Sequence, residues 1–252
     1  MTPDNITNLP AWPYPRWIAH RGAGKLAPEN TLTAFRLGAA HGYRMFECDA
    51  KLSADGVVFL MHDATLERTT SGQGIGGDQS WHALSQLDAG SWHSRAFVGE
   101  PLPTLEALAG FCRANGHLLD IEIKPTPGTE AATGEAVACL AARLWMGSAV
   151  PPLLTSFQPE ALAAAQQTAP ELPRGLLVDT LWQGWFEKAR ALGCVAVVAN
   201  YSLWDANTVA QVHGAGMRCL SYTVNDDWAA QHLLALGTDG IITDQIDLFT
   251  PN

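Results

Sequence analysis

Hydrophobic positions along the chain form short apolar runs that alternate with longer segments of helical periodicity. Eight runs are mainly apolar, and those from residue 153 onward are short and continuous, which is typical of strands buried on both faces of a sheet. They cover residues 16–20, 45–52, 118–124, 153–156, 175–178, 195–199, 217–224 and 240–243. The helical segments cover residues 31–41, 104–114, 130–145, 159–168, 181–192, 205–213 and 227–236. This alternation predicts an α/β fold, a parallel TIM (β/α)8 barrel.

A ninth apolar run, Val57–His62, breaks the alternation. Only the four residues Ser53–Gly56 separate it from the preceding strand, whereas a parallel crossover needs a dozen or more. The Asp55–Gly56 pair within this link is typical of a hairpin. We therefore expect the run to lie antiparallel to the end of the second strand, at the mouth of the barrel.

Residues 64–103 are too long and too irregular for an ordinary connection, and residues 71–80 are rich in glycine. We expect a small insertion after the His62–Asp63 hairpin strand. The chain otherwise has the length of one catalytic barrel domain, residues 1–252. An open doubly wound sheet is the alternative fold, but no glycine fingerprint follows the first strand.

Composition and charge narrow the class of protein. Hydrophobic residues make up 47% of the chain and charged residues 16%, which indicates a globular protein with a large core. The net charge is −10 and no run of five basic residues occurs, so we expect no nucleic-acid partner. The five cysteines are widely spaced and are expected to be buried free thiols: Cys48, Cys112, Cys139, Cys194 and Cys219.

The N-terminal segment, Met1–Pro15, contains four prolines and no apolar core of a signal peptide. We expect it to be a loosely attached arm. No apolar run is long enough to insert stably into a membrane, so a cytoplasmic protein is expected. The sequence leaves the oligomeric state open.

Polar side chains gather at the ends of the first three barrel strands and of the hairpin strand. They are His20 and Arg21, then Glu47 and Asp49, then Glu122 and Lys124, and, in the hairpin, His62 and Asp63. Because active sites of such barrels lie at the carboxyl ends of the strands, we expect all of them in one pocket. Gly22 is expected to turn the chain away from that pocket without crowding a bound phosphate.

The three carboxylates Glu47, Asp49 and Glu122 would repel one another unless a cation lay between them. Oxygen ligands favour Mg²⁺, Ca²⁺ or Mn²⁺ over zinc. The alternative is a set of structural ion pairs, Glu47 with Arg44 or Lys51 and Glu122 with Lys124.

Two histidines and two cations complete the expected pocket. His20 and His62 could divide the roles of acid and base. Arg21 and Lys124 would bind an anion, for which phosphate is the natural choice. A metal, two cations and a histidine pair favour phosphoester cleavage over glycoside hydrolysis, which requires two carboxyls and no cations.

These residues form an ordered set of motifs that closely resembles the glycerophosphodiester phosphodiesterase family. The set runs His20-Arg21-Gly22, Pro28-Glu29-Asn30-Thr31, Glu47-x-Asp49, His62-Asp63, Pro103-Thr104-Leu105, Glu122-Ile123-Lys124, Ser156-Phe157, Tyr222-Thr223-Val224-Asn225 and Asp239–Asp244. The resemblance covers nearly the whole chain, from His20 to Asp244.

The resemblance implies hydrolysis of glycerophosphodiesters, such as glycerophosphocholine or glycerophosphoethanolamine, to glycerol 3-phosphate and an alcohol. It implies catalytic His20 and His62, a divalent metal on Glu47, Asp49 and Glu122, and phosphate on Arg21 and Lys124. Two departures concern substrate preference: Tyr222 stands where the family usually has Trp, and Gln245-Ile246-Asp247 replaces a proline-containing turn. Trp92 and Tyr222 are the candidate residues of a substrate pocket.

Two other functions stay open at this point. A phospholipase D-like activity on lysophospholipids would need an apolar entrance, which Trp81, Trp92 and Phe97 could line, although aromatic residues of an insertion more often form its own core. A non-catalytic binder of phosphate esters could use the same barrel.

Overall fold

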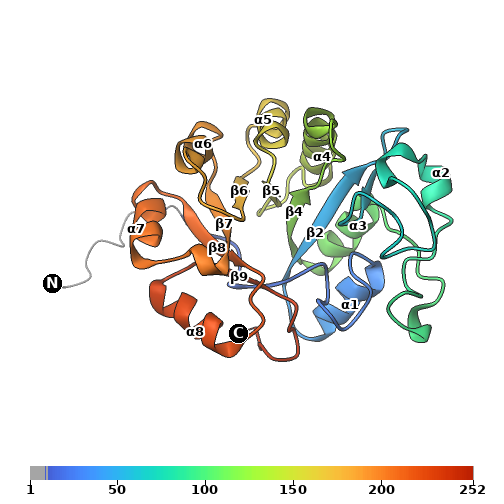
Figure 1. Cartoon of the computed structure of the whole chain (residues 1–252), viewed down its shortest axis with the longest axis horizontal. Coiled ribbons are helices and arrows are strands. Elements are labelled where there is room, and N and C mark those ends of the chain that lie inside the picture. Colours follow the sequence, from blue (N-terminus) through green and yellow to red (C-terminus); the bar gives the residue numbers. More distant parts are fainter. Residues whose placement is uncertain (1–8, 10, 252) are drawn as a thin grey trace.

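The computed structural model describes residues 9 and 11–251 and confirms the predicted barrel. Eight parallel strands close on themselves, and helices surround them (Figure 1). The barrel strands are β1 (Trp17–Ala19), β2 (Met45–Leu52), β4 (Leu118–Ile123), β5 (Leu153–Ser156), β6 (Arg174–Val178), β7 (Ala196–Asn200), β8 (Arg218–Tyr222) and β9 (Gly240–Thr243). The helices around them are α1 (Leu32–Ala40), α3 (Leu105–Asn115), α4 (Glu130–Leu144), α5 (Pro159–Thr168), α6 (Trp185–Ala191), α7 (Ala206–Gly214) and α8 (Asp227–Leu236).

The register of the barrel is unequal around its circumference. Strands β2 and β4 pair over six positions, from Met45↔Leu118 to Ala50↔Ile123. Strands β1 and β2, which close the barrel, pair at Ala19↔Phe46 alone. The closing seam is therefore much shorter than the β2–β4 ladder.

One strand, β3 (Val58–Leu60), lies outside the barrel. It pairs antiparallel with the end of β2, as the short Asp-Gly link predicted. The segment between β3 and α3 contains only short elements: η1 (Gly76–Asp78), α2 (Trp81–Leu84) and η2 (Arg95–Phe97). It lies beside β2 and α3, at the right of Figure 1. A small apolar cluster of its own holds it together, in which Leu66, Leu84 and Leu102 pack against Phe59 and Met61 of the hairpin.

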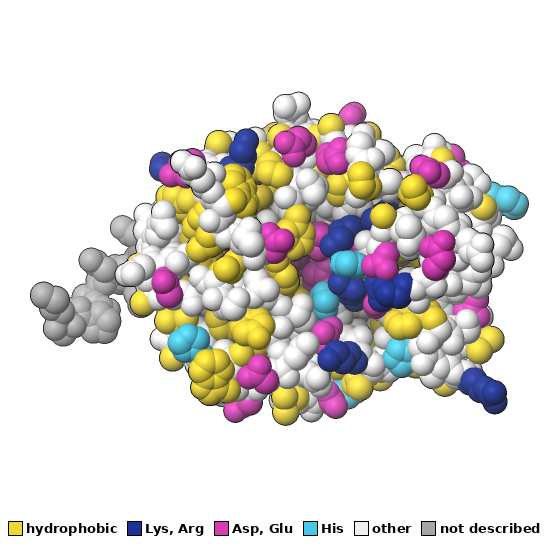
Figure 2. Space-filling model, in the orientation of Figure 1, with side chains coloured by type: hydrophobic (Ala, Val, Ile, Leu, Met, Phe, Trp, Pro, Cys, Tyr) yellow, Lys and Arg dark blue, Asp and Glu magenta, His cyan; other side chains and the backbone are white. Residues whose placement is uncertain are grey.

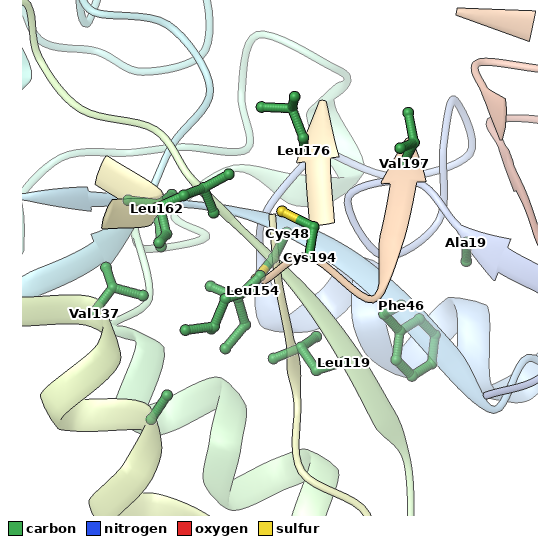
Figure 3. Close-up of a cluster of buried hydrophobic side chains, with 14 of the residues drawn as sticks. Ala19, Phe46, Cys48, Leu119, Val137, Leu154, Leu162, Leu176, Cys194 and Val197 are labelled. Carbon is green, nitrogen blue, oxygen red and sulfur yellow. The ribbon is translucent and has the colours of Figure 1, made fainter. Parts of the chain in front are cut away.

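Two hydrophobic layers follow from the alternation of side chains along the strands. Inside the barrel lie Ile18, Met45, Leu153, Leu177, Ala196, Val198, Leu220 and Ile242. The larger layer lies between the strands and the helices, and Figure 3 shows part of it, including Phe46, Cys48, Leu119 and Leu154. Odd-numbered residues of β2 and even-numbered residues of β4 therefore point into the barrel.

Helix boundaries agree with the pattern where a cap is encoded. Thr104 caps α3 by accepting a hydrogen bond from the Ala107 amide, as the sequence indicated. The expected helix 181–192 begins only at Trp185, because Gly184 adopts a left-handed φ of 92°. Leu181 and Trp182, at the start of the expected helix, are exposed loop residues.

The expectation of a loosely attached N-terminal arm is wrong for its described end. Tyr14 is 6% exposed, donates a hydrogen bond to the Pro151 carbonyl at 2.9 Å, and packs with the barrel interior. Trp12 packs edge-on against its ring, with centroids 4.8 Å apart. Residues 1–8 and 10 of the expected arm lie outside the described residues.

Within the described residues, no helix is both long and apolar enough to cross a membrane. All five cysteines are free thiols, as expected, but only four are buried, because Cys139 is exposed on α4. Gly22 adopts a positive φ of 99°, which suits the expected turn, and it has a second role. A side chain there would press on the Ala34 and Phe35 backbone, so the glycine allows close packing on α1.

Candidate active site

The three predicted carboxylates lie together inside the barrel mouth. Glu47 and Asp49 point inward from β2, and Asp49 is paired in register with Glu122 of β4. Ligand atoms of Glu47, Asp49 and Glu122 all lie within 4.8 Å of one another, and all three side chains are buried. Spacing by two along a strand and parallel pairing between strands produce this cluster.

The cluster has the properties of a cation site. Glu47 Oε1 and Asp49 Oδ1 are buried and have no hydrogen-bond partner among the described residues. Burial and the neighbouring carboxylates raise the pKa of Glu47, and burial together with Asp49 raises the pKa of Glu122 to about 7. Buried acceptors without donors are costly, so the donor set fits a hard divalent cation bound through oxygen.

Asp49 is the best-compensated member of the cluster. Its Oδ2 accepts a hydrogen bond from Asn30 Nδ2 at 2.8 Å and lies 3.2 Å from Arg21 Nε. Burial alone would raise the pKa of Asp49, but Arg21 and Lys124 overcome it and hold that pKa well below its usual range. Arg21 and Asn30 adopt left-handed φ angles of 50° and 60°, which a side chain disfavours, so the loop after β1 is constrained around Asp49.

The expected ion pairs form only in part. Lys124 Nζ lies 2.7 Å from Glu122 Oε1 and 3.7 Å from Asp49 Oδ1. Glu47 forms no ion pair with Arg44 or Lys51 among the described residues. Its Oε2 instead accepts a hydrogen bond from the Arg21 backbone amide at 3.0 Å.

His20 is held by a carboxylate from the far end of the chain. Its Nδ1 lies 2.6 Å from Asp244 Oδ1, and Asp244 Oδ2 accepts a hydrogen bond from Asn225 at 2.9 Å. Burial opposes ionisation of Asp244, but the hydrogen bond with His20 lowers its pKa to about 2. Gly24 lies directly against the Asp244 backbone, where a side chain would overlap it.

His62 has a corresponding carboxylate partner. Its Nδ1 lies 2.7 Å from Asp63 Oδ1, and burial lowers its pKa. Because an ionised carboxylate only accepts, Nδ1 of each histidine carries the proton and Nε2 is left for the reaction.

A salt-bridge network joins the insertion to the barrel loop. Arg68, in the segment after β3, bonds Asp63 at 2.6 and 3.0 Å and Glu29 at 2.8 and 2.7 Å. Glu29 also accepts a hydrogen bond from Arg21 at 2.8 Å. A continuous series of contacts therefore connects one histidine to the carboxylate cluster, in the order His62, Asp63, Arg68, Glu29 and Arg21.

Two adjoining cavities open at this mouth. The smaller, of about 170 Å³, is lined by His20, Arg21, Glu47, Asp120, Glu122, Leu177, Tyr222 and Ile242 among others. The larger, of about 580 Å³, extends beyond His62. Figure 2 shows basic, acidic and histidine side chains gathered around a hollow at the centre of this face, with apolar side chains on its left.

The two candidate substrate-pocket residues lie in different places. Tyr222 lines the smaller cavity, and its hydroxyl donates to the Val178 carbonyl at 3.0 Å. Trp92 lines neither of these two cavities. Its indole N–H donates to the Ala89 carbonyl at 2.8 Å, within the insertion. Trp81 packs against the insertion's own apolar cluster, whereas Phe97 packs against the larger core and Trp92 is 39% exposed.

Sequence reasoning assigned no role to four residues that the geometry brings to the site: Glu29, Arg68, Asp120 and Asp244. Glu29 and Asp244 stood inside recognised motifs, so a signal for them was present. Arg68 lies in the irregular insertion, where no periodicity indicated it. Asp120 follows from the strand alternation that selected Glu122, since both side chains point inward from β4.

Cationic side chains that could bind an anion lie here beside carboxylates that fit a metal, an arrangement suited to the cleavage of phosphate esters. The barrel and its site are thus those of a hydrolase that acts on phosphate esters. Comparison with known proteins makes this assignment specific. The profile of the Glycerophosphoryl diester phosphodiesterase family matches residues 20–248. The chain belongs to this family.

Individual relatives agree over nearly the full length. The chain is 32% identical to a glycerophosphodiester phosphodiesterase of Caldanaerobacter subterraneus subsp. tengcongensis, covering 90% of this chain and 93% of the relative. It is 28% identical to a glycerophosphodiester phosphodiesterase of Bacillus subtilis, covering 92% and 84%. An Oleispira antarctica phosphodiesterase, solved in complex with the product sn-glycerol-3-phosphate, is 34% identical with a TM-score of 0.85 and coverages of 91% and 93%.

Proposed function

We propose that the protein hydrolyses glycerophosphodiesters, such as glycerophosphocholine or glycerophosphoethanolamine, to glycerol 3-phosphate and an alcohol with the help of a divalent cation. The observation that carries this proposal is a pair of buried oxygens without a hydrogen-bond partner among the described residues, Glu47 Oε1 and Asp49 Oδ1, beside two cationic side chains. Such a site accepts a metal and a phosphate together. The family match and the product complex of the Oleispira relative support the same reaction.

The cation would be held by Glu47, Asp49 and Glu122, and the oxygen donor set selects Mg²⁺, Ca²⁺ or Mn²⁺. When bound, it supplies Lewis-acid stabilisation of the negative charge on the phosphoryl oxygens.

The two cationic side chains would hold the phosphate. Arg21 Nη1 donates a hydrogen bond to Glu29 Oε1 at 2.8 Å, and its Nε makes an ion-pair contact with Asp49 at 3.2 Å. Lys124 adds a point charge beside Glu122. Because both cations are fixed by carboxylates, they are already oriented when the diester enters.

His20 and His62 would perform the proton transfers. Each presents Nε2 while an aspartate holds Nδ1, the arrangement that a histidine needs to exchange one proton with a substrate. One histidine would activate the nucleophile, either water or the neighbouring glycerol hydroxyl, and the other would protonate the leaving alkoxide.

One assay tests reaction, metal requirement and pathway together. Glycerophosphocholine and glycerophosphoethanolamine would be incubated with the protein, with Mg²⁺ or Ca²⁺ or with a chelator, and the products followed by phosphorus NMR. We expect glycerol 3-phosphate only when metal is present, and a transient cyclic phosphate if the glycerol hydroxyl attacks. Tight binding of the diester with no product in metal would instead establish a non-catalytic binder.

A lysophospholipid substrate is the second candidate. The aromatic residues of the insertion line neither cavity, and Leu181 and Trp182, in the loop after β6 on the same end of the barrel, are 41% and 38% exposed. If they bind an acyl chain, lysophosphatidylcholine should be cleaved faster than glycerophosphocholine, and Trp182→Ala should abolish the difference. If the wild type and Trp182→Ala each cleave the two substrates at equal rates, the two residues do not bind an acyl chain. We further propose a cytoplasmic location, which cell fractionation would test.

A further inference from the structure

The larger cavity at the barrel mouth lies beside the reaction site rather than within it. It shares His62, Glu122, Lys124 and Phe157 with the smaller cavity but contains neither His20 nor Arg21. Its volume is about 580 Å³, against about 170 Å³ for the smaller one. A group attached to a phosphate held between Arg21 and Lys124 can extend into it past His62.

A buried lysine lines this cavity. Lys51, the last inward-facing residue of β2, is 1% exposed, and its Nζ donates to the Lys124 carbonyl at 3.1 Å. It makes no ion pair among the described residues, and an ammonium has three N–H donors. Two of the chain's four lysines, Lys51 and Lys124, thus lie at one cavity of an acidic protein.

The carboxylates that line the cavity are already engaged. Asp63 is bonded by His62 and Arg68. Glu122 is bonded by Lys124 and belongs to the proposed cation site. Both carboxylates of the lining are thus held by other side chains, and neither forms a direct ion pair with Lys51.

The cavity also lacks an open aromatic face. Phe157 is the one phenyl, phenol or indole ring in its lining, and Lys124 Nζ lies 5.4 Å from the centre of that ring. A quaternary ammonium is bound by aromatic faces or by carboxylates. Here a lysine already covers the ring, and a second cation would meet like charge.

We propose that this cavity receives the alcohol released from the diester, and that Lys51 and Lys124 make it select uncharged, hydroxyl-rich alcohols over quaternary ammonium alcohols. Hydroxyl oxygens accept hydrogen bonds from the spare donors of Lys51, and the exposed Gln158 side chain offers both donors and acceptors to them. The assignment rests on the proposed function and adds which alcohol is preferred. It also places His62 beside the leaving oxygen, as the acid of the reaction.

The test is a comparison of kcat/KM for glycerophosphoglycerol and glycerophosphocholine, read as glycerol 3-phosphate released. We expect the wild-type protein to favour glycerophosphoglycerol by about tenfold or more, the usual effect of a hydrogen bond to a charged group. Lys51→Met keeps the length and removes the charge, and it should reduce the ratio toward one. Lys188→Met makes the same change on the exposed face of α6 and should leave the ratio unaltered.

The outcomes separate the assignment from the proposed function. No glycerol 3-phosphate from either diester would overturn the proposed function, and this assignment with it. Product from both diesters with glycerophosphocholine equal or preferred would overturn the assignment alone, whether or not Lys51→Met folds. A wild-type preference that Lys51→Met retains would also overturn the role of Lys51, and Lys51→Arg, which keeps the charge, should preserve the preference if the role is correct.

Discussion

The two histidines differ in their surroundings although both use Nδ1 to bind an aspartate. His20 lies in the smaller cavity, where its Nε2 is 3.8 Å from Glu47 Oε2. His62 lies between the two cavities. Because their surroundings differ, substrates with different leaving groups can show which histidine is the acid and which is the base.

His62→Ala should lower kcat on glycerophosphodiesters by about 10²–10⁴-fold, the usual contribution of a general acid. With a p-nitrophenyl phosphodiester the loss should be far smaller, because phenolate leaves without protonation. His20→Ala should impair both substrates to a similar degree. Steady-state rates on both substrates check this, and the reverse pattern would exchange the two roles.

Asp244 links a residue-scale contact to stability. Its pKa is lowered to about 2 in the folded protein through the bond to His20, against about 3.8 when unfolded. The contact therefore stabilises the fold fully above pH 3.8, and this stabilisation is lost as the pH falls toward 2. Asp244→Asn should be less stable than wild type near pH 6, and the difference should shrink below pH 4 in urea unfolding curves. A constant difference across that range would contradict the pairing.

At the scale of elements, Arg68 fixes the position of the insertion relative to the loop after β1. Arg68→Gln would remove its four hydrogen bonds to Asp63 and Glu29, which would leave Asp63 held by His62 alone and Glu29 by Arg21 alone. Because partners that orient catalytic groups typically contribute 10–100-fold, we expect about tenfold lower kcat or more.

Stability is the matched readout for this variant. Arg68 is 44% exposed, so its ion pairs should contribute no more than about 1 kcal/mol to the free energy of unfolding. Arg113→Gln, an exposed change on α3, should alter neither kcat nor the unfolding midpoint. Loss of activity that tracks loss of folded protein would show that Arg68 serves the fold alone.

Elements with a local signal were predictable from sequence. The Asp55–Gly56 hairpin, the Thr104 cap and the eight apolar strands each depend on neighbouring residues. The link between His20 and Asp244 spans 224 positions and follows only from barrel closure, which no local pattern encodes. The attachment of Tyr14 was missed for the same reason, since its partner Pro151 belongs to the opposite half of the chain.

On the scale of the whole molecule, the segment before β1 covers the end of the barrel at which the strands begin, where Tyr14 packs with the interior side chains. Tyr14→Ala should lower the free energy of unfolding by about 3–5 kcal/mol, as for a large buried ring, while Tyr14→Phe should cost only about 1 kcal/mol. Denaturant unfolding of both variants checks this. An unchanged midpoint for Tyr14→Ala would mean that the plug does not contribute to the barrel.

Metal should stabilise the whole protein, because the folded chain assembles three carboxylates that repel one another without it. At 100 times its dissociation constant, a ligand adds about 2.7 kcal/mol, so Mg²⁺ or Ca²⁺ should raise Tm by roughly 5–10 °C for a chain of this size. Thermal denaturation with metal and with chelator measures the shift. Glu47→Gln should largely remove it, and a wild-type Tm indifferent to both ions would argue against the cation site.

The short β1–β2 seam has a consequence for how the protein fluctuates. Ladder amides exchange their hydrogens with solvent only when the pairing opens, and opening is easiest where pairing is shortest. A single register pair, Ala19↔Phe46, joins these two strands, and the next residues along them are His20 and Glu47. Strand β1 also pairs with β9 at three positions, and the His20 amide donates to Thr243. Deuterium should therefore enter those amides of β1 that face β2 before it enters the β2–β4 ladder. A bound ion or phosphate that contacts both His20 and Glu47 would link the ends of β1 and β2. Ligand binding should therefore slow the opening of this seam and help to hold the barrel closed.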